Sequence, residues 1–244
     1  MLGGSFRRLA PRARVGAMQY GAATIQQEPG MWNREELGGL RGHLAEVIAR
    51  SHIVLEHVTR ALCDSGTSAA SALPDAEKAL YLLRQAVDDQ ALAIEETRVV
   101  PPMAAVPTIV VAAQVNADAE GVAGLAGRLA EIAGSRPGRP AIPADVQAVV
   151  CRMGQACVDM MATAVSAGRS PRADTAARIA AADAEVRRLG QRLHQLLLHD
   201  SAPIEVDAAL DAALAGRYYA RCAELAGSMA RHASPGAHSG QAGQ

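Results

Sequence analysis

The stretch "AGRYYARCAELAGSMARHA", Ala215–Ala233, decides the fold because a related stretch stands one hundred residues earlier (223 − 123 = 100). The earlier copy is "EGVAGLAGRLAEIA", Glu120–Ala133. The positions that are identical at this offset are Ala123/Ala223, Leu125/Leu225, Ala126/Ala226, Gly127/Gly227, Ala130/Ala230 and Ala133/Ala233. A segment that recurs at a fixed offset indicates an internal structural repeat.

The sequence around both copies has the apolar period of helices. Leu, Val, Ile, Met and Ala recur three and four residues apart, as on the buried face of an amphipathic helix. We expect six helices, at about 34–63, 74–99, 107–133, 143–165, 174–199 and 203–233. Pro74 and Pro143 mark two of the starts, since proline is favoured in the first turn. The pattern predicts an all-α protein of two tandem three-helix bundles related by an internal repeat.

The linker "GSRPGRP" at 134–140 separates the two units, so we expect one bundle at 31–135 and the other at 136–233. Residues 1–30 hold four arginines and no acid before Glu28. This composition predicts either a disordered extension or a start codon assigned too early, and it lacks the apolar stretch of a secretory signal. Residues 234–244 are rich in Gly and Ser and predict a disordered tail.

The composition agrees with packed helices and excludes several classes of function. The chain is 50% hydrophobic but only 2% aromatic, which disfavours a β-sandwich. A net charge of −1 gives no basic field for nucleic acid. No window of the sequence reaches 18 uninterrupted apolar residues, so we expect no membrane span. The cysteines, Cys63, Cys151, Cys157 and Cys222, lack CxxC spacing and predict reduced, buried thiols in a cytoplasmic protein.

No sequence motif indicates catalysis. The chain has no nucleophile elbow, P-loop, HExxH or dinucleotide fingerprint, so we expect no enzyme activity. The acids of the second helix, Asp88, Asp89, Glu95 and Glu96, are interpreted as a solvated face, with a binding face as the alternative.

Three glycines, Gly121, Gly124 and Gly127, follow one another at spacing three in the first copy. Each glycine inside a helix costs about 1 kcal/mol relative to alanine. Either another helix approaches closely there, or side chains that once stood there have been lost.

The two copies resemble the end helices of the PhoU family of phosphate-uptake regulators, over about residues 31–233. In that family each half ends with a helix that carries a motif like "E-R-I-G-D-H-A-x-x-I-A". The stretch "LAGRYYARCAELA", Leu214–Ala226, is similar to the second copy, and "EGVAGLAGRLAEIA" is similar to the first. The resemblance implies a protein of two related three-helix bundles.

In the family, paired acids four residues apart can hold iron or zinc clusters, because they project from one helix face. This chain keeps one acid in each copy, Glu120 and Glu224, while Gly124 and Ala220 stand where the other acids are expected. Asp118 could add an oxygen, but on an ideal helix it lies about 200° from Glu120. The resemblance therefore implies, at these degenerate positions, weak iron or zinc binding at most, and no other cofactor.

The resemblance also implies a function. It is negative regulation of phosphate uptake and of phosphate-starvation signalling. Such a protein would be a cytoplasmic adaptor between the ATPase of a phosphate ABC transporter and a sensor histidine kinase, and commonly a homodimer. Two alternatives stay open from the residues: a metal-binding helical bundle, and a diverged paralogue that has lost the signalling role.

Overall fold

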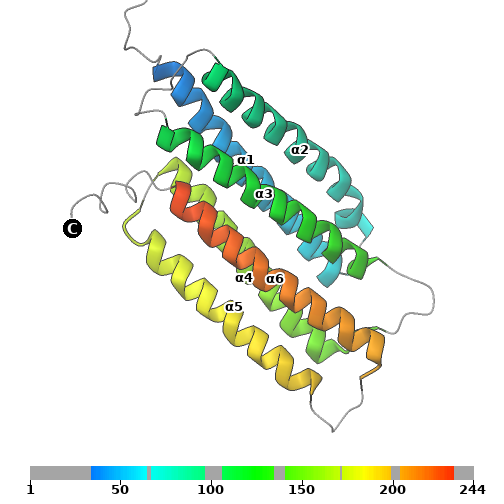
Figure 1. Cartoon of the computed structure of the whole chain (residues 1–244). Helices are drawn as coiled ribbons and strands as arrows, with labels where there is room; N and C mark the ends of the chain where they lie inside the picture. Colours follow the sequence, from blue (N-terminus) through cyan, green and yellow to red (C-terminus); the bar gives the residue numbers. More distant parts are fainter. Residues whose placement is uncertain are drawn as a thin grey trace, which may run out of the picture. The chain divides into compact units, whose positions relative to one another are not determined.

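The computed structural model describes residues 34–64, 67–96, 106–134, 141–170, 172–198 and 204–233. Within these ranges the chain forms six helices and no strand (Figure 1). They are α1 Arg34–Cys63, α2 Thr67–Glu96, α3 Val106–Ala133, α4 Ala144–Arg169, α5 Thr175–Leu197 and α6 Val206–Ala233. The all-α prediction is confirmed.

The start of α2 differs from the sequence prediction. The helix begins at Thr67 and carries Pro74 in its interior, whereas Pro74 was predicted to open it. Leu73 is buried in the core, so packing holds the turn before the proline in helical form. Pro74 itself is exposed. Tertiary packing has therefore outweighed a local start signal.

The helices are arranged as two groups of three. α1, α2 and α3 pack on one another, and α4, α5 and α6 do the same. The groups meet mainly through α1 with α4 and α3 with α6, with a smaller contact between α1 and α6. Successive helices run in opposite directions, with α2 and α5 at the two outer edges (Figure 1). All six helices lie in one compact unit.

The division at 135/136 stays a prediction, because it falls in a segment that the structure does not describe. The expected N-terminal extension, 1–30, and the expected tail, 234–244, also lie outside the described residues.

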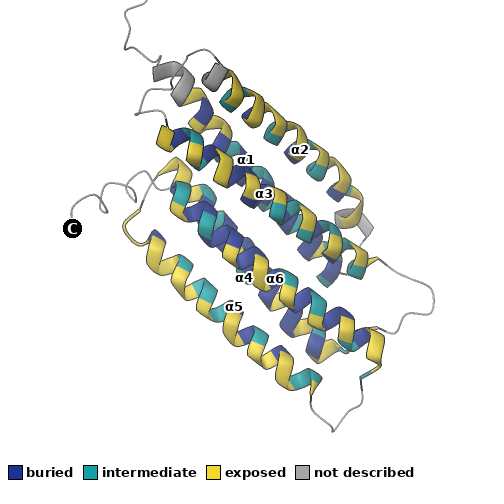
Figure 2. Cartoon of the chain, in the orientation of Figure 1, coloured by how far each residue is buried: buried dark blue, intermediate teal, exposed yellow. Residues whose placement is uncertain are grey.

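The core is built from Leu, Val, Met and Ala of all six helices (Figure 2). Its largest fully buried side chain is Tyr219 of α6, whose hydroxyl donates to Oγ1 of Thr59 in α1 at 3.2 Å. In α4, a Cβ added to Gly154 would lie 2.8 Å from Cζ of Tyr219, so the glycine makes room for the ring. One aromatic side chain thus contacts helices of both groups.

The cysteines differ from the expectation of four reduced, buried thiols. Cys63 at the end of α1 and Cys151 near the start of α4 form a disulfide, with their Cα atoms 5.6 Å apart. Both residues are half-buried. Cys157 and Cys222 are free and buried, as expected. The contact between α1 and α4 brings together two residues that lie 88 positions apart, which sequence spacing does not reveal.

Among the described residues, α4 is the one helix whose length and composition would allow it to cross a membrane. Of its most apolar window, 56% is buried inside the bundle. The core helix of a soluble protein passes the same test, so this is weak evidence for a span.

Candidate functional site: the groove between α3 and α6

The repeated stretches lie side by side in space and line one groove of about 520 Å³. Three pairs of positions one hundred residues apart, Asp118/Tyr218, Gly121/Arg221 and Leu125/Leu225, contribute to its walls. The lining residues are Gln114, Ala117, Asp118, Glu120, Gly121, Gly124, Leu125 and Arg128 of α3, with Tyr218, Arg221 and Leu225 of α6. The internal repeat therefore places corresponding parts of the two halves around a single surface, which we call the α3–α6 groove.

The glycines of α3 have different surroundings. A Cβ on Gly121 would lie 2.9 Å from Cδ1 of Leu225, so the end of this side chain from α6 packs directly over the glycine. Nothing lies within 4 Å of a Cβ on Gly124 or on Gly127. Packing of a side chain from another helix thus accounts for Gly121 alone, and the loss of a side chain remains the interpretation for Gly124 and Gly127.

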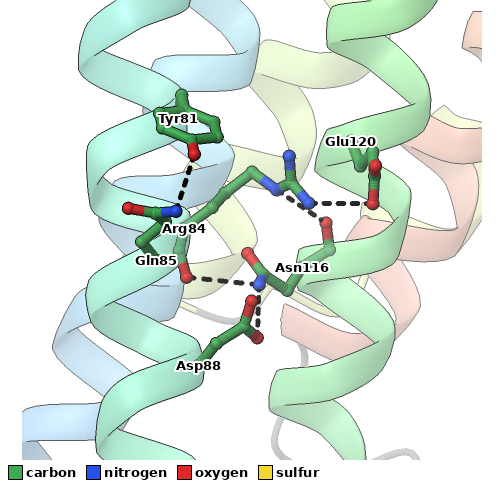
Figure 3. Close-up of polar contacts among 6 residues, drawn as sticks. All are labelled: Tyr81, Arg84, Gln85, Asp88, Asn116 and Glu120. Atoms are coloured by element: carbon green, nitrogen blue, oxygen red, sulfur yellow. Dashed lines mark hydrogen bonds and ion pairs between the residues drawn. The ribbon is translucent and has the colours of Figure 1, made fainter.

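Glu120 lies at the exposed rim of the groove and is ion-paired to the neighbouring helix (Figure 3). Nη2 of Arg84 in α2 donates to its Oε2 at 2.9 Å. The Arg84 side chain is 15% exposed and that of Glu120 is 73% exposed, so the guanidinium reaches outward from the α2–α3 contact. The carboxylate of Glu120, the first predicted metal ligand, is therefore already paired with an arginine of its own chain.

The same cluster fastens α2 to α3. Nε of Arg84 donates to the backbone oxygen of Asn116 at 3.1 Å, and Nδ2 of Asn116 donates to Oδ1 of Asp88 at 2.6 Å (Figure 3). Asn116 is buried. Of the acids singled out in the second helix, Asp88 thus serves a contact between helices, and Asp89 is exposed. The side chains of Glu95 and Glu96 lie outside the described residues.

Glu224 does not join Glu120. It is exposed, ion-paired to Arg221 three residues earlier, and it lines a different groove, between α5 and α6. Within the described ranges no group of three or more His, Cys, Asp or Glu side chains could hold a metal ion. The structure therefore separates the two predicted ligands and gives each a guanidinium partner.

Asp118 is buried beneath the groove surface, with 5% of the residue exposed. Nε2 of Gln114 donates to its Oδ1 at 3.1 Å, while Oδ2 is buried without a hydrogen-bond partner. The helical angle suggested that Asp118 points away from Glu120, yet both line the groove, one at its floor and one at its rim. A buried carboxylate oxygen without a donor is a costly arrangement, which favours a donor arriving from outside.

Two exposed arginines on the groove were missed from the sequence. Arg128 of α3 places its guanidinium 5.9 Å from the ring centroid of Tyr218 in α6. Arg221 stands where the first copy has Gly121. This difference between the two copies was the signal that could have identified Arg221 as a candidate site residue, because it adds a cation at one of two equivalent positions.

The donor set does not fit a cluster of the kind that the resemblance implies. A hard cation needs several oxygens at once, whereas the carboxylates of Glu120 and Glu224 are separate and each accepts from a guanidinium. We expect purified, untagged protein to contain no stoichiometric iron or zinc by elemental analysis. Stoichiometric metal that is lost in Glu120→Ala or Glu224→Ala would contradict this expectation, and Asp89→Ala serves as the matched control.

A family model described as the PhoU domain matches residues 150–233. The chain is 27% identical over 197 residues to proteins of Mycobacterium tuberculosis and Mycobacterium bovis, both named phosphate-specific transport system accessory protein PhoU homolog 2. In each case the match covers 81% of this chain and 92% of the relative.

Two solved structures share the fold. PhoU from Pseudomonas aeruginosa superposes with a TM-score of 0.68 at 20% identity, covering 82% of this chain and 96% of that one. A putative PhoU-like phosphate regulatory protein from Shewanella oneidensis gives a TM-score of 0.57 at 13% identity, with 81% and 96% covered. The family model matches only the second half, whereas these longer matches take in both halves.

Proposed function

We propose that this chain is a divergent member of the PhoU family and a negative regulator of phosphate uptake and of phosphate-starvation signalling. The observation that carries the proposal is the extent of the likeness to the mycobacterial accessory proteins, which covers 92% of their length. A protein that kept only one three-helix unit would match about half of the length of these relatives.

The proposed role is that of a cytoplasmic adaptor, without catalytic activity, between the ATPase of a phosphate ABC transporter and a sensor histidine kinase. Binding to one state of a partner in preference to another shifts the balance between the states. A coupling of about 1–3 kcal/mol changes a partner's affinity 5- to 150-fold. A surface of ordinary size can supply such a difference, and a homodimer would present the surface twice.

We propose the α3–α6 groove as the surface that meets the transporter ATPase. Its exposed cations, Arg128 and Arg221, suit an acidic partner segment. The unpartnered oxygen of Asp118 offers an acceptor for a single donor from the same partner. Complementary charges of this kind give orientation and specificity to an encounter.

The metal-binding alternative receives less support, because Arg84 and Arg221 hold the carboxylates that a cation would need. The diverged-paralogue alternative is an outcome of the experiment that follows.

Deletion of the gene is expected to raise transcription of phosphate-scavenging genes while phosphate is plentiful, because the partners lose the regulator that holds them in the replete state. Transcript levels in high-phosphate medium measure this, in a strain that also lacks any second PhoU-like gene. Restoring the gene on a plasmid provides the control. Unchanged transcription in that strain, with no capture of a transport ATPase or a kinase by the purified protein, would leave the diverged paralogue as the correct reading.

A further inference from the structure

The disulfide lies at the junction of the two three-helix groups. Cys63 ends α1 and Cys151 lies near the start of α4, and α1 and α4 are one of the helix pairs that join the groups. The bond closes a loop across 88 positions, which contains the whole of α2 and α3. At the same junction Nε2 of Gln147 donates to the backbone oxygen of Leu62 at 3.3 Å. One covalent bond and one weak hydrogen bond therefore tie the end of α1 to α4.

The two cysteine pairs differ in their capacity to react. The thiolate is the form that attacks a disulfide. Burial raises the pKa of Cys157 well above its ordinary value and that of Cys222 to about 12, and both residues are fully buried. The thiol of Cys157 also donates to the backbone oxygen of Tyr219 at 3.1 Å. Cys63 and Cys151 are half-buried, so solvent reaches them. Thiol chemistry is thereby confined to the pair at the junction.

We propose that Cys63 and Cys151 form a reversible thiol–disulfide switch that sets how firmly the two three-helix groups are joined. The oxidant is a low-molecular-weight disulfide. One cysteine thiolate attacks it, forming a mixed disulfide and releasing one small thiol. The second cysteine then attacks the mixed disulfide, closes the protein disulfide and releases a second small thiol. Two electrons pass from the protein to the small disulfide, and the two protons lost by the cysteines end on the released thiols.

The two states differ in the tether at the junction. In the oxidised state α1 cannot leave α4 at this end. In the reduced state the hydrogen bond from Gln147 and the packing of Leu62 remain, so the end of α1 opens more often. The inference goes beyond the proposed function and does not depend on it, because it concerns the junction whatever partner the protein has.

The test equilibrates the purified full-length protein with mixtures of reduced and oxidised glutathione. After acid quenching and alkylation, mass spectrometry gives the oxidised fraction of each cysteine. We expect the Cys63–Cys151 pair to pass from mostly reduced to mostly oxidised across the series, while Cys157 and Cys222 stay reduced. The oxidised protein should melt roughly 5–15 °C higher than the reduced protein, and the end of α1 should exchange amide hydrogens faster after reduction.

Matched variants separate the effect of the disulfide from any effect of the glutathione mixture itself. Cys63→Ser and Cys151→Ser should each melt like the reduced wild-type protein, whatever glutathione mixture is used. If a variant fails to fold, the comparison of oxidised with reduced wild-type protein decides alone. A pair that stays reduced, or stays bonded, in every mixture would overturn the proposal, and so would equal melting temperatures and equal hydrogen exchange in the two states.

Discussion

Replacing Tyr219 by alanine is expected to lower the free energy of unfolding by about 3–5 kcal/mol, the range for deleting a buried aromatic side chain. The side chain is fully buried and contacts both groups of helices: its hydroxyl meets Thr59 of α1, and its ring covers Gly154 of α4. The ring occupies the space beside Gly154, which has no side chain of its own. Because no side chain at that position can fill the space, the cavity left by Tyr219→Ala should stay open. Urea denaturation followed by circular dichroism measures the loss.

Tyr219→Phe is the matched control, because it keeps the ring and removes only the hydrogen bond to Thr59. It should cost about 1 kcal/mol. The wild-type and variant proteins should be compared with the Cys63–Cys151 pair in one redox state, since a disulfide can change the free energy of unfolding by itself. A loss below about 1 kcal/mol in Tyr219→Ala would show that the ring does not hold the two groups together.

The helices could be predicted from the sequence because each one repeats an apolar position every three or four residues. The end of α1 at Cys63 and the end of α3 at Ala133 coincide with breaker-rich segments, and the structure places them there. The beginning of α2 could not be predicted, because it depends on Leu73 packing into the core. A local proline signal carries no information about that contact.

The contacts between the two halves could not be predicted from the sequence either. Cys63 meets Cys151 only because α1 packs against α4, and Asp118 becomes a groove residue only because α6 lies beside α3. Both facts depend on how two helical units pack together. The periodicity within either unit says nothing about that packing.

The candidate site was predicted in part. The motif identified Glu120 and Glu224, but not that the two would line different grooves. The partner of Glu224 was within reach of sequence reasoning, because Arg221 lies three residues away on the same helix. The partner of Glu120 was not, since Arg84 belongs to another helix.

Reversing both groove arginines, Arg128→Glu with Arg221→Glu, is expected to weaken capture of the transport ATPase at least tenfold. The change turns two cations into two anions on one surface, and like charges facing a partner reduce both the encounter rate and the affinity. Both side chains are exposed, so the fold should survive. The lost contact between Arg128 and Tyr218 should cost about 0.5–1 kcal/mol. Pull-down and titration at two salt concentrations measure the affinity, and circular dichroism confirms the helical content.

The matched control is Arg178→Glu with Arg192→Glu, which makes the same change in net charge at exposed positions of α5 outside the groove. If the two double variants lose affinity equally, net charge and not the groove governs binding. If the groove variant binds the ATPase as tightly as the wild-type protein, the ATPase docks elsewhere. Loss in the groove variant alone, together with failure to restore repression in the deletion strain, would tie the regulatory role to the surface that the two repeated stretches build.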